Sequence, residues 1–191
     1  MQRWLVFSVI LFICIKTWAQ DPGFSQFFAN PVHLNPAFTG TTELPRFVMN
    51  YRNQWPSKGS TFTTYSLSFD RHFENNKTGI GFQIIRDQEL NNIINSNSVY
   101  FLYSYHLQLD NRSFMTLGLQ AGATLKQFNP HNLVFPSGIN QLNGEIYEYA
   151  SANYSAEKKI YPDFSVGALG QHNEVFWGAS LHHLTTRSEE R

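Results

Sequence analysis

The feature that most constrains the fold is a strict two-residue alternation of apolar and polar side chains along extended stretches of the chain. The clearest example is SVYFLYSYHLQL, residues 98–109. Its apolar set is Val99, Phe101, Tyr103, Tyr105, Leu107 and Leu109, and the opposite set includes Ser98, Ser104, His106 and Gln108. Successive side chains of a β-strand point to opposite faces, so this pattern predicts a sheet with one apolar and one polar face.

Six further segments carry a similar pattern, so we predict about seven strands. They lie near residues 46–55, 63–70, 78–84, 115–126, 163–171 and 174–184. Most are longer than the roughly five or six residues of strands in soluble sheets. A tilted strand that crosses a membrane needs about 9–11 residues, so the lengths favour an antiparallel outer-membrane β-barrel.

The connections between these segments alternate between short and long. Compact polar turns are predicted at residues 72–77, 110–112 and 172–174, and longer loops at 55–60, 87–97 and 129–162. Short turns at one end and long loops at the other are typical of membrane β-barrels. If the first strand starts in the periplasm, the short turns fall on the periplasmic side.

The first 19 residues have the features of a secretory signal peptide. Arg3 supplies the positive charge, residues 4–15 are mostly apolar, and residues 17–19 lead to a cleavage site before Gln20. Removal of this leader would take away Cys14, the only cysteine, and therefore exclude disulfides and a thiol nucleophile. The sequence thus predicts an exported protein.

Seven strands are an odd number, whereas bacterial single-chain barrels have an even number. Either the long loop hides another strand or the chain is part of a larger barrel, and we favour the larger barrel. The predicted organisation is a signal peptide (1–19), an irregular segment at the periplasmic mouth (20–45), barrel strands (46–184) with the long loop 129–162, and a polar tail (185–191).

Polar side chains on the predicted strands are candidates for a channel lining or a cargo site. They are Asn50, Arg52, Asp70, Gln83, His106, Gln120 and Lys126. The more ordinary interpretation is that they hydrogen-bond one another and water inside a filled barrel. Glycines within strands indicate curvature or close packing against an element in the lumen. They are Gly79, Gly81, Gly118 and Gly122.

Nothing in the sequence indicates catalysis, a cofactor or a metal site. No nucleophile-elbow or paired-carboxylate arrangement occurs, and His106, His131 and His172 lack metal-ligand spacing. The neighbours His182 and His183 are predicted to point to opposite faces of a strand. A formal net charge of zero gives no basic surface for nucleic acid.

Aromatic side chains are candidates for the interfacial girdles of a membrane barrel. The candidates are Trp55, Tyr100, Tyr103, Tyr105 and Trp177. The alternative is that they pack in the core of a soluble β-sandwich.

The segment QDPGFSQFFANPVHLNPAFTG, residues 20–40, precedes the first strand and has neither helical nor strand periodicity. Its Asn-Pro pairs disfavour helix at the residue before each proline. Phe24, Phe27, Phe28 and Phe38 call for an apolar environment. We therefore predict that the segment packs into or across the mouth of the barrel.

This segment resembles the start of mature PorP/SprF proteins of the type IX secretion system. The matching positions are Asp21, Pro22, Phe24, Ser25, Gln26, Asn30, Pro31, Asn35, Pro36, Ala37, Phe38 and Gly40. YRNQWP (51–56, with Arg52 and Trp55), YPDFSVGAL (161–169, with Pro162 and Asp163) and WGASLHHL (177–184, with His182) also match. Family members are longer, and their later strands have no counterpart here.

The resemblance implies an outer-membrane barrel of a Bacteroidetes-type bacterium. Its partners would be outer-membrane lipid, the periplasmic ring and motor proteins, and secreted cargo such as adhesins. The implied role is export or surface attachment of sorting-domain proteins, including adhesins for gliding motility, and the motif residues become candidates for partner contact. The alternatives are an exported soluble β-sandwich that binds a glycan or protein, and a general porin-like channel.

Overall fold

Seven antiparallel strands form one sheet in the computed structural model, which describes residues 24, 26–56, 61–90, 92–129 and 157–185. The strands are β1 (Arg46–Gln54), β2 (Phe62–Phe73), β3 (Thr78–Glu89), β4 (Ile94–Asp110), β5 (Ser113–Phe128), β6 (Glu157–His172) and β7 (Val175–Leu181). Each strand pairs with its neighbours in the chain, in the order β1 to β7. The predicted all-β antiparallel fold is confirmed.

The short connections lie where the sequence predicts them, between β2 and β3, β4 and β5, and β6 and β7. The first contains a 3₁₀ turn, η3 (Glu74–Asn76). The predicted long loop 87–97 is wrong, because Asp87 and Gln88 pair with Ser96 and Asn95 and only residues 90–93 connect β3 to β4. The strands pair here through their backbones, but the residues are mostly polar and lack the apolar–polar alternation from which strands were predicted.

The last two strands also differ from their predicted bounds. β6 begins at Glu157 rather than at Asp163, and β7 ends at Leu181 rather than at Leu184. Most of the predicted long loop, residues 130–156, lies outside the described residues.

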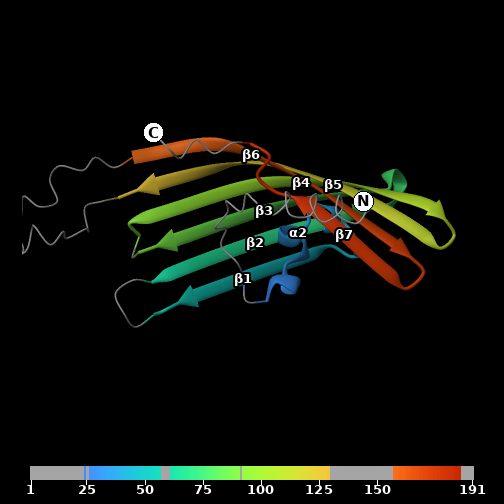
Figure 1. The fold of residues 1–191 in the computed structure, drawn as a ribbon, viewed down its shortest axis with the longest axis horizontal. Helices are drawn as coiled ribbons and strands as arrows, with labels where there is room; N and C mark the ends of the chain where they lie inside the picture. The colour runs from blue at the N-terminus through green and yellow to red at the C-terminus, as the bar shows by residue number, and fades with distance from the viewer. Residues whose placement is uncertain (1–23, 25, 57–60, 91, 130–156, 186–191) are drawn as a thin grey trace, which may run out of the picture.

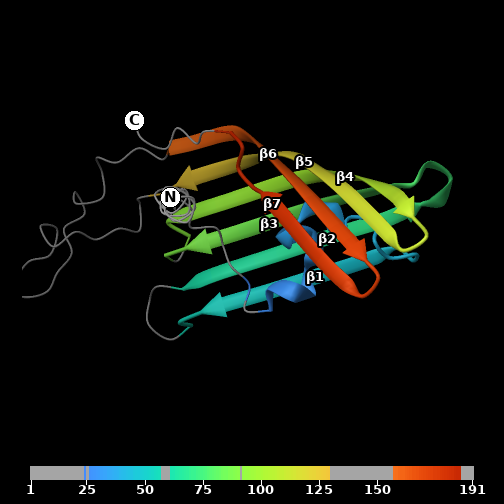
Figure 2. The ribbon, with the colours of Figure 1, turned by 45° about the vertical axis from the view of Figure 1, so that its right-hand side comes forward.

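The sheet curls into a half-barrel whose outermost strands are β1 and β7 (Figures 1 and 2). Residues 26–40, which precede β1, lie on its concave side (Figure 2). They form three short turns, η1 (Phe27–Ala29), α2 (Pro31–Leu34) and η2 (Pro36–Phe38). No helix among the described residues is both long and apolar enough to cross a membrane.

The convex face of the sheet is apolar and exposed. A row of residues in direct cross-strand register runs over it from β1 to β6. The row is Phe47, Phe69, Phe82, Phe101, Ala121 and Phe164. Phe47 and Phe101 are 61% and 54% exposed. A contiguous apolar surface of this kind needs a non-aqueous neighbour such as lipid.

The concave face is polar and buried, which reverses the arrangement of a soluble sheet. Side chains buried there include Thr64, Ser66, Ser68, Asp70, Gln83, Ser104, Gln120, Thr124, Asp163 and Ser165. Apolar side chains outside and polar ones inside are the pattern of a membrane barrel wall.

Strand β4 carries two large apolar exceptions on this face. Tyr100 and Leu102 lie on the concave side and are buried, so the prediction of Tyr100 in an outer aromatic girdle is wrong. Tyr103 and Tyr105 do lie on the outer face, 37% and 41% exposed. Strand alternation explains the placement of Tyr100, because it puts Tyr100 on the same face of β4 as Ser98 and Ser104.

Candidate functional site: a crossbar on a glycine–serine row

The N-terminal segment crosses the concave face twice before the chain enters β1. Asn30 contacts β2, and Asn35 contacts β6 and β7. The chain then returns over β5 at Ala37, over β3 and β4 at Thr39, and over β2 at Gly40. We call residues 30–40 the crossbar, because they join strands at both sides of the half-barrel.

A row of very small side chains lies under the returning part of the crossbar. One cross-strand register position on β3 to β7 holds only glycine or serine. The glycine–serine row is Gly79, Ser104, Gly118, Gly167 and Ser180. The other rows of paired residues on the concave face each include a larger side chain. An example is Leu102, which pairs with Gly81 in the adjacent row. The row therefore forms a shallow channel across the strands.

The glycines of this row are needed for space. A Cβ atom added to Gly118 would overlap the Ala37 backbone, one on Gly79 would overlap Thr39, and one on Gly167 would overlap the Asn35 side chain. The prediction that strand glycines mark close packing against a lumen element is confirmed for Gly79 and Gly118. Gly122 serves a different neighbour, since its added Cβ would overlap Tyr100.

Asn35 joins the crossbar to two strands at once. Its Nδ2 donates to the carbonyl oxygens of Ala168 in β6 (3.2 Å) and Ala179 in β7 (3.0 Å). Its Oδ1 accepts from the Ala37 N–H at 2.9 Å, which also caps η2. Both amide hydrogens and the amide oxygen are thus engaged, and only asparagine presents these groups at this reach. The following proline, Pro36, occupies the first position of η2, where its missing N–H costs nothing.

Asn30 anchors the other side of the crossbar. Its Nδ2 donates to Ser66 Oγ at 3.1 Å, and its Oδ1 accepts from Ser68 Oγ at 3.2 Å. The side chain is fully buried. The two Asn-Pro pairs of the motif therefore fix the crossbar to β2 and to β6–β7, respectively.

A buried ion pair fixes the end of the crossbar. Asp70, 1% exposed, accepts from Arg46 Nε at 2.9 Å and from Arg46 Nη2 at 3.0 Å. Asp70 Oδ2 also accepts from the Gly40 N–H at 2.8 Å, and Arg46 Nη2 donates to the Phe38 carbonyl at 2.9 Å. Gly40 has φ of +64°, which favours glycine at this bend. The carboxylate is satisfied from three directions, as a buried charge requires.

Strand side chains also bind the crossbar backbone. Ser104 Oγ donates to the Thr39 carbonyl at 2.6 Å, and Ser180 Oγ donates to the Leu34 carbonyl at 3.0 Å. His182 Nε2 lies 3.1 Å from the same Leu34 oxygen. These bonds satisfy carbonyl groups that the short turns leave without internal partners.

A second polar cluster lies nearby on the concave face. Asp163 Oδ2 accepts from the Tyr100 hydroxyl at 3.0 Å and lies 2.7 Å from His183 Nδ1. Both His182 and His183 thus turn inward, and the prediction that they point to opposite faces is wrong. The positive φ of His183, +55°, breaks the alternation just after β7. No cluster of three or more potential metal ligands occurs among the described residues.

The structure brings only part of the predicted site together. Of the motif residues, the crossbar members, Asp163 and His182 lie on the concave face. Arg52 and Trp55 lie at the other end of β1, and Pro162 is exposed on the outer face of β6. Phe24 packs edge-on against His33, and Gln26 is exposed. Asp21, Pro22 and Ser25 lie outside the described residues.

The phenylalanines of the segment do not provide its buried contacts. Phe27 and Phe28 are 58% and 68% exposed, whereas Val32, Ala37 and the two asparagines are buried. The expectation that the four phenylalanines lie in a buried apolar environment is therefore wrong for Phe27 and Phe28. The crossbar is held by hydrogen bonds and close backbone contact, with a minor apolar contribution.

The sequence reasoning missed Arg46, Ser104, Gly167 and Ser180 as site residues. The alternation of β1 could have pointed to Arg46, because it places Arg46 on the same face as Asn50 and Arg52. In the structure Arg46 pairs with Asp70 across the strands. The glycine–serine row becomes visible only once the strand register is known, because its members are scattered over a hundred residues of sequence.

The fold and the site together define a class of protein: a β-barrel wall with an apolar exterior and a polar interior crossed by its own N-terminal segment. The chain belongs to the PorP/SprF family, since the family model described as "Type IX secretion system membrane protein PorP/SprF" matches residues 17–191. The resemblance seen in the motifs is thereby confirmed. The searches for similar curated proteins and for similar solved structures gave no match.

Proposed function

We propose that the protein is an outer-membrane component of the type IX secretion system that supports export or surface attachment of sorting-domain proteins, including adhesins used in gliding motility. Family membership supports the secretion system. The observation that carries the argument for a structural role, as opposed to a channel, is the crossbar. It occupies the concave face that would otherwise line a pore.

The seven strands would be part of a larger barrel. β1 and β7 each have one edge that pairs with no described strand. Unpaired strand edges are unfavourable in lipid. Because β1 and β7 run in the same direction in a meander of seven, closure with antiparallel pairing needs an odd number of additional strands. A second copy oriented the same way would instead place its β1 parallel to β7.

The proposed orientation follows from the leader and the connections. Residues 1–19 would act as the signal peptide, and the short turns would face the periplasm. The crossbar then enters β1 from the periplasmic side, where ring and motor proteins of the secretion system are within reach. The long connections would face outward, toward cargo.

The two alternatives are less well supported. A soluble β-sandwich would bury its apolar face against a second sheet, whereas the apolar face here is exposed and the polar face is covered. A general porin would need an open polar lumen, and the crossbar lies across that surface.

The test is deletion of the gene followed by complementation with the complete protein, with separate measurement of membrane fractionation and of secreted sorting-domain cargo. We expect the protein in the detergent-extracted outer-membrane fraction and loss of surface cargo in the deletion strain. Recovery in the aqueous fraction would contradict the membrane assignment. Normal cargo export together with conductance in planar bilayers would support the porin instead.

A further inference from the structure

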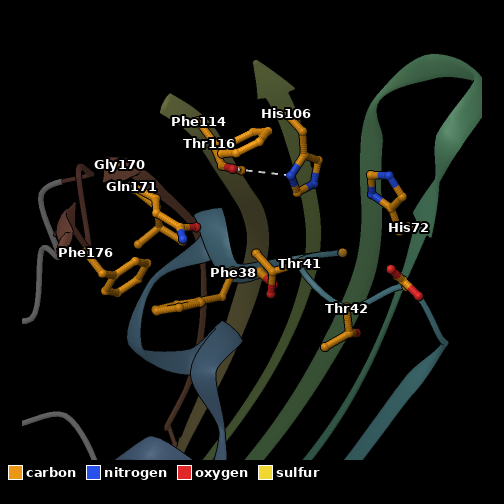
Figure 3. A pocket seen from close by; sticks show the side chains of 13 residues that line it. Phe38, Thr41, Thr42, His72, His106, Phe114, Thr116, Gly170, Gln171 and Phe176 are labelled. Carbon is orange, nitrogen blue, oxygen red and sulfur yellow. Dashed lines mark hydrogen bonds between the residues drawn. The ribbon is translucent and has the colours of Figure 1, made fainter. Parts of the chain in front are cut away.

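A cavity of about 340 Å³ lies at the end of the half-barrel that carries the short turns (Figure 3). One side is formed by the last part of the crossbar and the residues that follow it, from Phe38 to Glu43. The other side is formed by the ends of β2, β4, β5, β6 and β7. Its volume is at the lower end of the range for ligand pockets in proteins.

One wall of this cavity is apolar and aromatic. It is formed by Phe38, Leu169 and Phe176, whereas the Phe114 ring lies beside Thr116 and His106 (Figure 3). Phe38 and Phe176 lie with their ring centroids 5.8 Å apart, and Phe176 is 56% exposed (Figure 3). The wall therefore offers ring faces to an apolar side chain that enters from the turn side.

The opposite wall is polar, and most of its groups are already bonded. His106 uses both ring nitrogens, with Ser104 Oγ at 3.1 Å and Thr116 Oγ1 at 3.2 Å. The hydroxyls of Thr41 and Thr42 donate to carbonyls of their own segment.

One group of the polar wall keeps bonding capacity that a ligand can reach. His72 Nδ1 has no hydrogen-bond partner among the described residues, but it is buried and its ring packs edge-on against His106, so it is closed to an incoming ligand. Glu43 is exposed and forms no ion pair with any residue in the described part of the chain. The cavity thus presents an aromatic wall and one exposed carboxylate.

We propose that this cavity binds an extended segment of a partner polypeptide that carries an aromatic side chain next to a lysine or arginine. The aromatic ring would pack against Phe38 and Phe176. The cationic group would pair with Glu43. An anionic ligand is disfavoured by Glu43, and a metal ion is disfavoured because His106 has no free nitrogen.

The proposed peptide site adjoins the residues that hold the end of the crossbar in place. Phe38 belongs to η2, and its carbonyl binds Arg46, which in turn holds Asp70. A peptide on Phe38 therefore contacts the element that fixes the crossbar to β2. This inference rests on the proposed function, since the turn side is the proposed periplasmic side where secretion-system partners lie.

The test uses the complete protein in lipid nanodiscs and a fluorinated probe, N-acetyl-4-fluoro-Phe-Lys amide, followed by ¹⁹F NMR titration. Matched probes replace Lys with Glu or the aromatic residue with Ala. We expect saturable binding of the Phe-Lys probe, at least several-fold weaker binding of the Phe-Glu probe, and roughly tenfold weaker binding of the Ala-Lys peptide in competition. Equal affinity for the three peptides would overturn the proposal.

Variants locate the site. Phe176→Ser should weaken binding of the Phe-Lys probe roughly tenfold. Glu43→Gln should weaken binding of the Phe-Lys probe about two- to fivefold, and binding of the Phe-Glu probe should be unchanged or tighter. Glu174→Gln, in the adjacent β6–β7 turn and outside the cavity lining, is the control and should change nothing. Both lining positions are exposed, so the fold should survive, which heat-dependent gel mobility verifies.

A Glu43→Gln variant with unchanged affinity and unchanged charge preference would overturn the role of this cavity. That result leaves the proposed function untouched, because loss of cargo export in the deletion strain is a separate measurement. Conversely, a protein that binds the probe as expected while cargo export is normal would keep the site and reject the secretion role.

Discussion

Two rows of residues on the same strands show how differently the two faces of the sheet are specified. On the inner face, the glycine–serine row holds nothing larger than a serine. On the outer face, the row from Phe47 to Phe164 holds an aromatic ring on five of its six strands. The two rows share β3 to β6, so the strand backbone alone does not account for the contrast.

The difference reflects what each face contacts. The outer row needs only an apolar and fluid neighbour, and many side chains of similar size meet that need. The inner row contacts one polypeptide segment at fixed positions, with each hydrogen bond and each missing Cβ matched to a particular atom. We therefore expect inner-face substitutions to cost much more stability than outer-face substitutions of similar size.

The largest effect is expected at the buried ion pair. Asp70→Ala removes the partner of Arg46 and of the Gly40 N–H, so we expect the free energy of unfolding to fall by about 3–5 kcal/mol. The control is Arg71→Ala, the next residue, which is exposed on the outer face. Denaturant unfolding of the protein in lipid measures both. A similar loss in the two variants would contradict the contrast between the faces.

The next effect is expected in the glycine–serine row. Gly118→Val places side-chain atoms where the Ala37 backbone lies, and should lower the free energy of unfolding by about 3 kcal/mol. The neighbouring outer-face change Leu119→Val should cost no more than about 1.5 kcal/mol. Limited proteolysis adds a second measurement, since displacement of the crossbar should make residues 30–40 cleavable only in the Gly118 variant.

A smaller loss of unfolding free energy is expected when Asn35, which joins the crossbar to β6 and β7, is replaced. Asn35→Ala removes bonds to β6, β7 and η2, and should cost about 2 kcal/mol of unfolding free energy. Asn53→Ala, on the exposed face of β1, serves as the matched control and should change stability by less than about 0.5 kcal/mol. If the Asn35 variant were as stable as the control, the crossbar would not depend on this side chain.

The smallest effect is expected for the exposed aromatic pair. The double change Phe27→Ser and Phe28→Ser should alter the free energy of unfolding by no more than about 0.5 kcal/mol, because both rings are largely exposed. The same unfolding assay checks this value. A loss comparable to that of Asn35→Ala would show that these rings are covered in the complete barrel.

The strand pattern could be predicted because alternation depends on local sequence alone. The seven segments, their order and the short turns follow from it, and so does the polar concave face with Asp70, Gln83 and Gln120. Strand ends were harder. Residues 87–89 pair with residues 94–96 although most of these side chains are polar, since backbone hydrogen bonds extend β3 and β4 past the apolar band.

The crossbar could be predicted only in part. The sequence predicts that residues 20–40 pack into or across the barrel mouth and points to their phenylalanines, whereas Asn30 and Asn35 make the hydrogen bonds to the strands. Arg46, Gly167 and Ser180 depend on cross-strand register, which a single sequence does not contain. The inward turn of His183 depends on one left-handed backbone residue that breaks the alternation used to predict it.

The most direct test of the crossbar is disulfide formation in intact cells. In a Cys14→Ser background, Asn30→Cys is combined with Ser66→Cys on the inner face of β2, or with Leu67→Cys, the adjacent outer-face residue. Asn30 Nδ2 and Ser66 Oγ lie 3.1 Å apart. We expect a cross-linked product on non-reducing gels for the Ser66 pair and none for the Leu67 pair. No cross-link with Ser66, or equal cross-linking of the two pairs, would contradict a crossbar on the concave face.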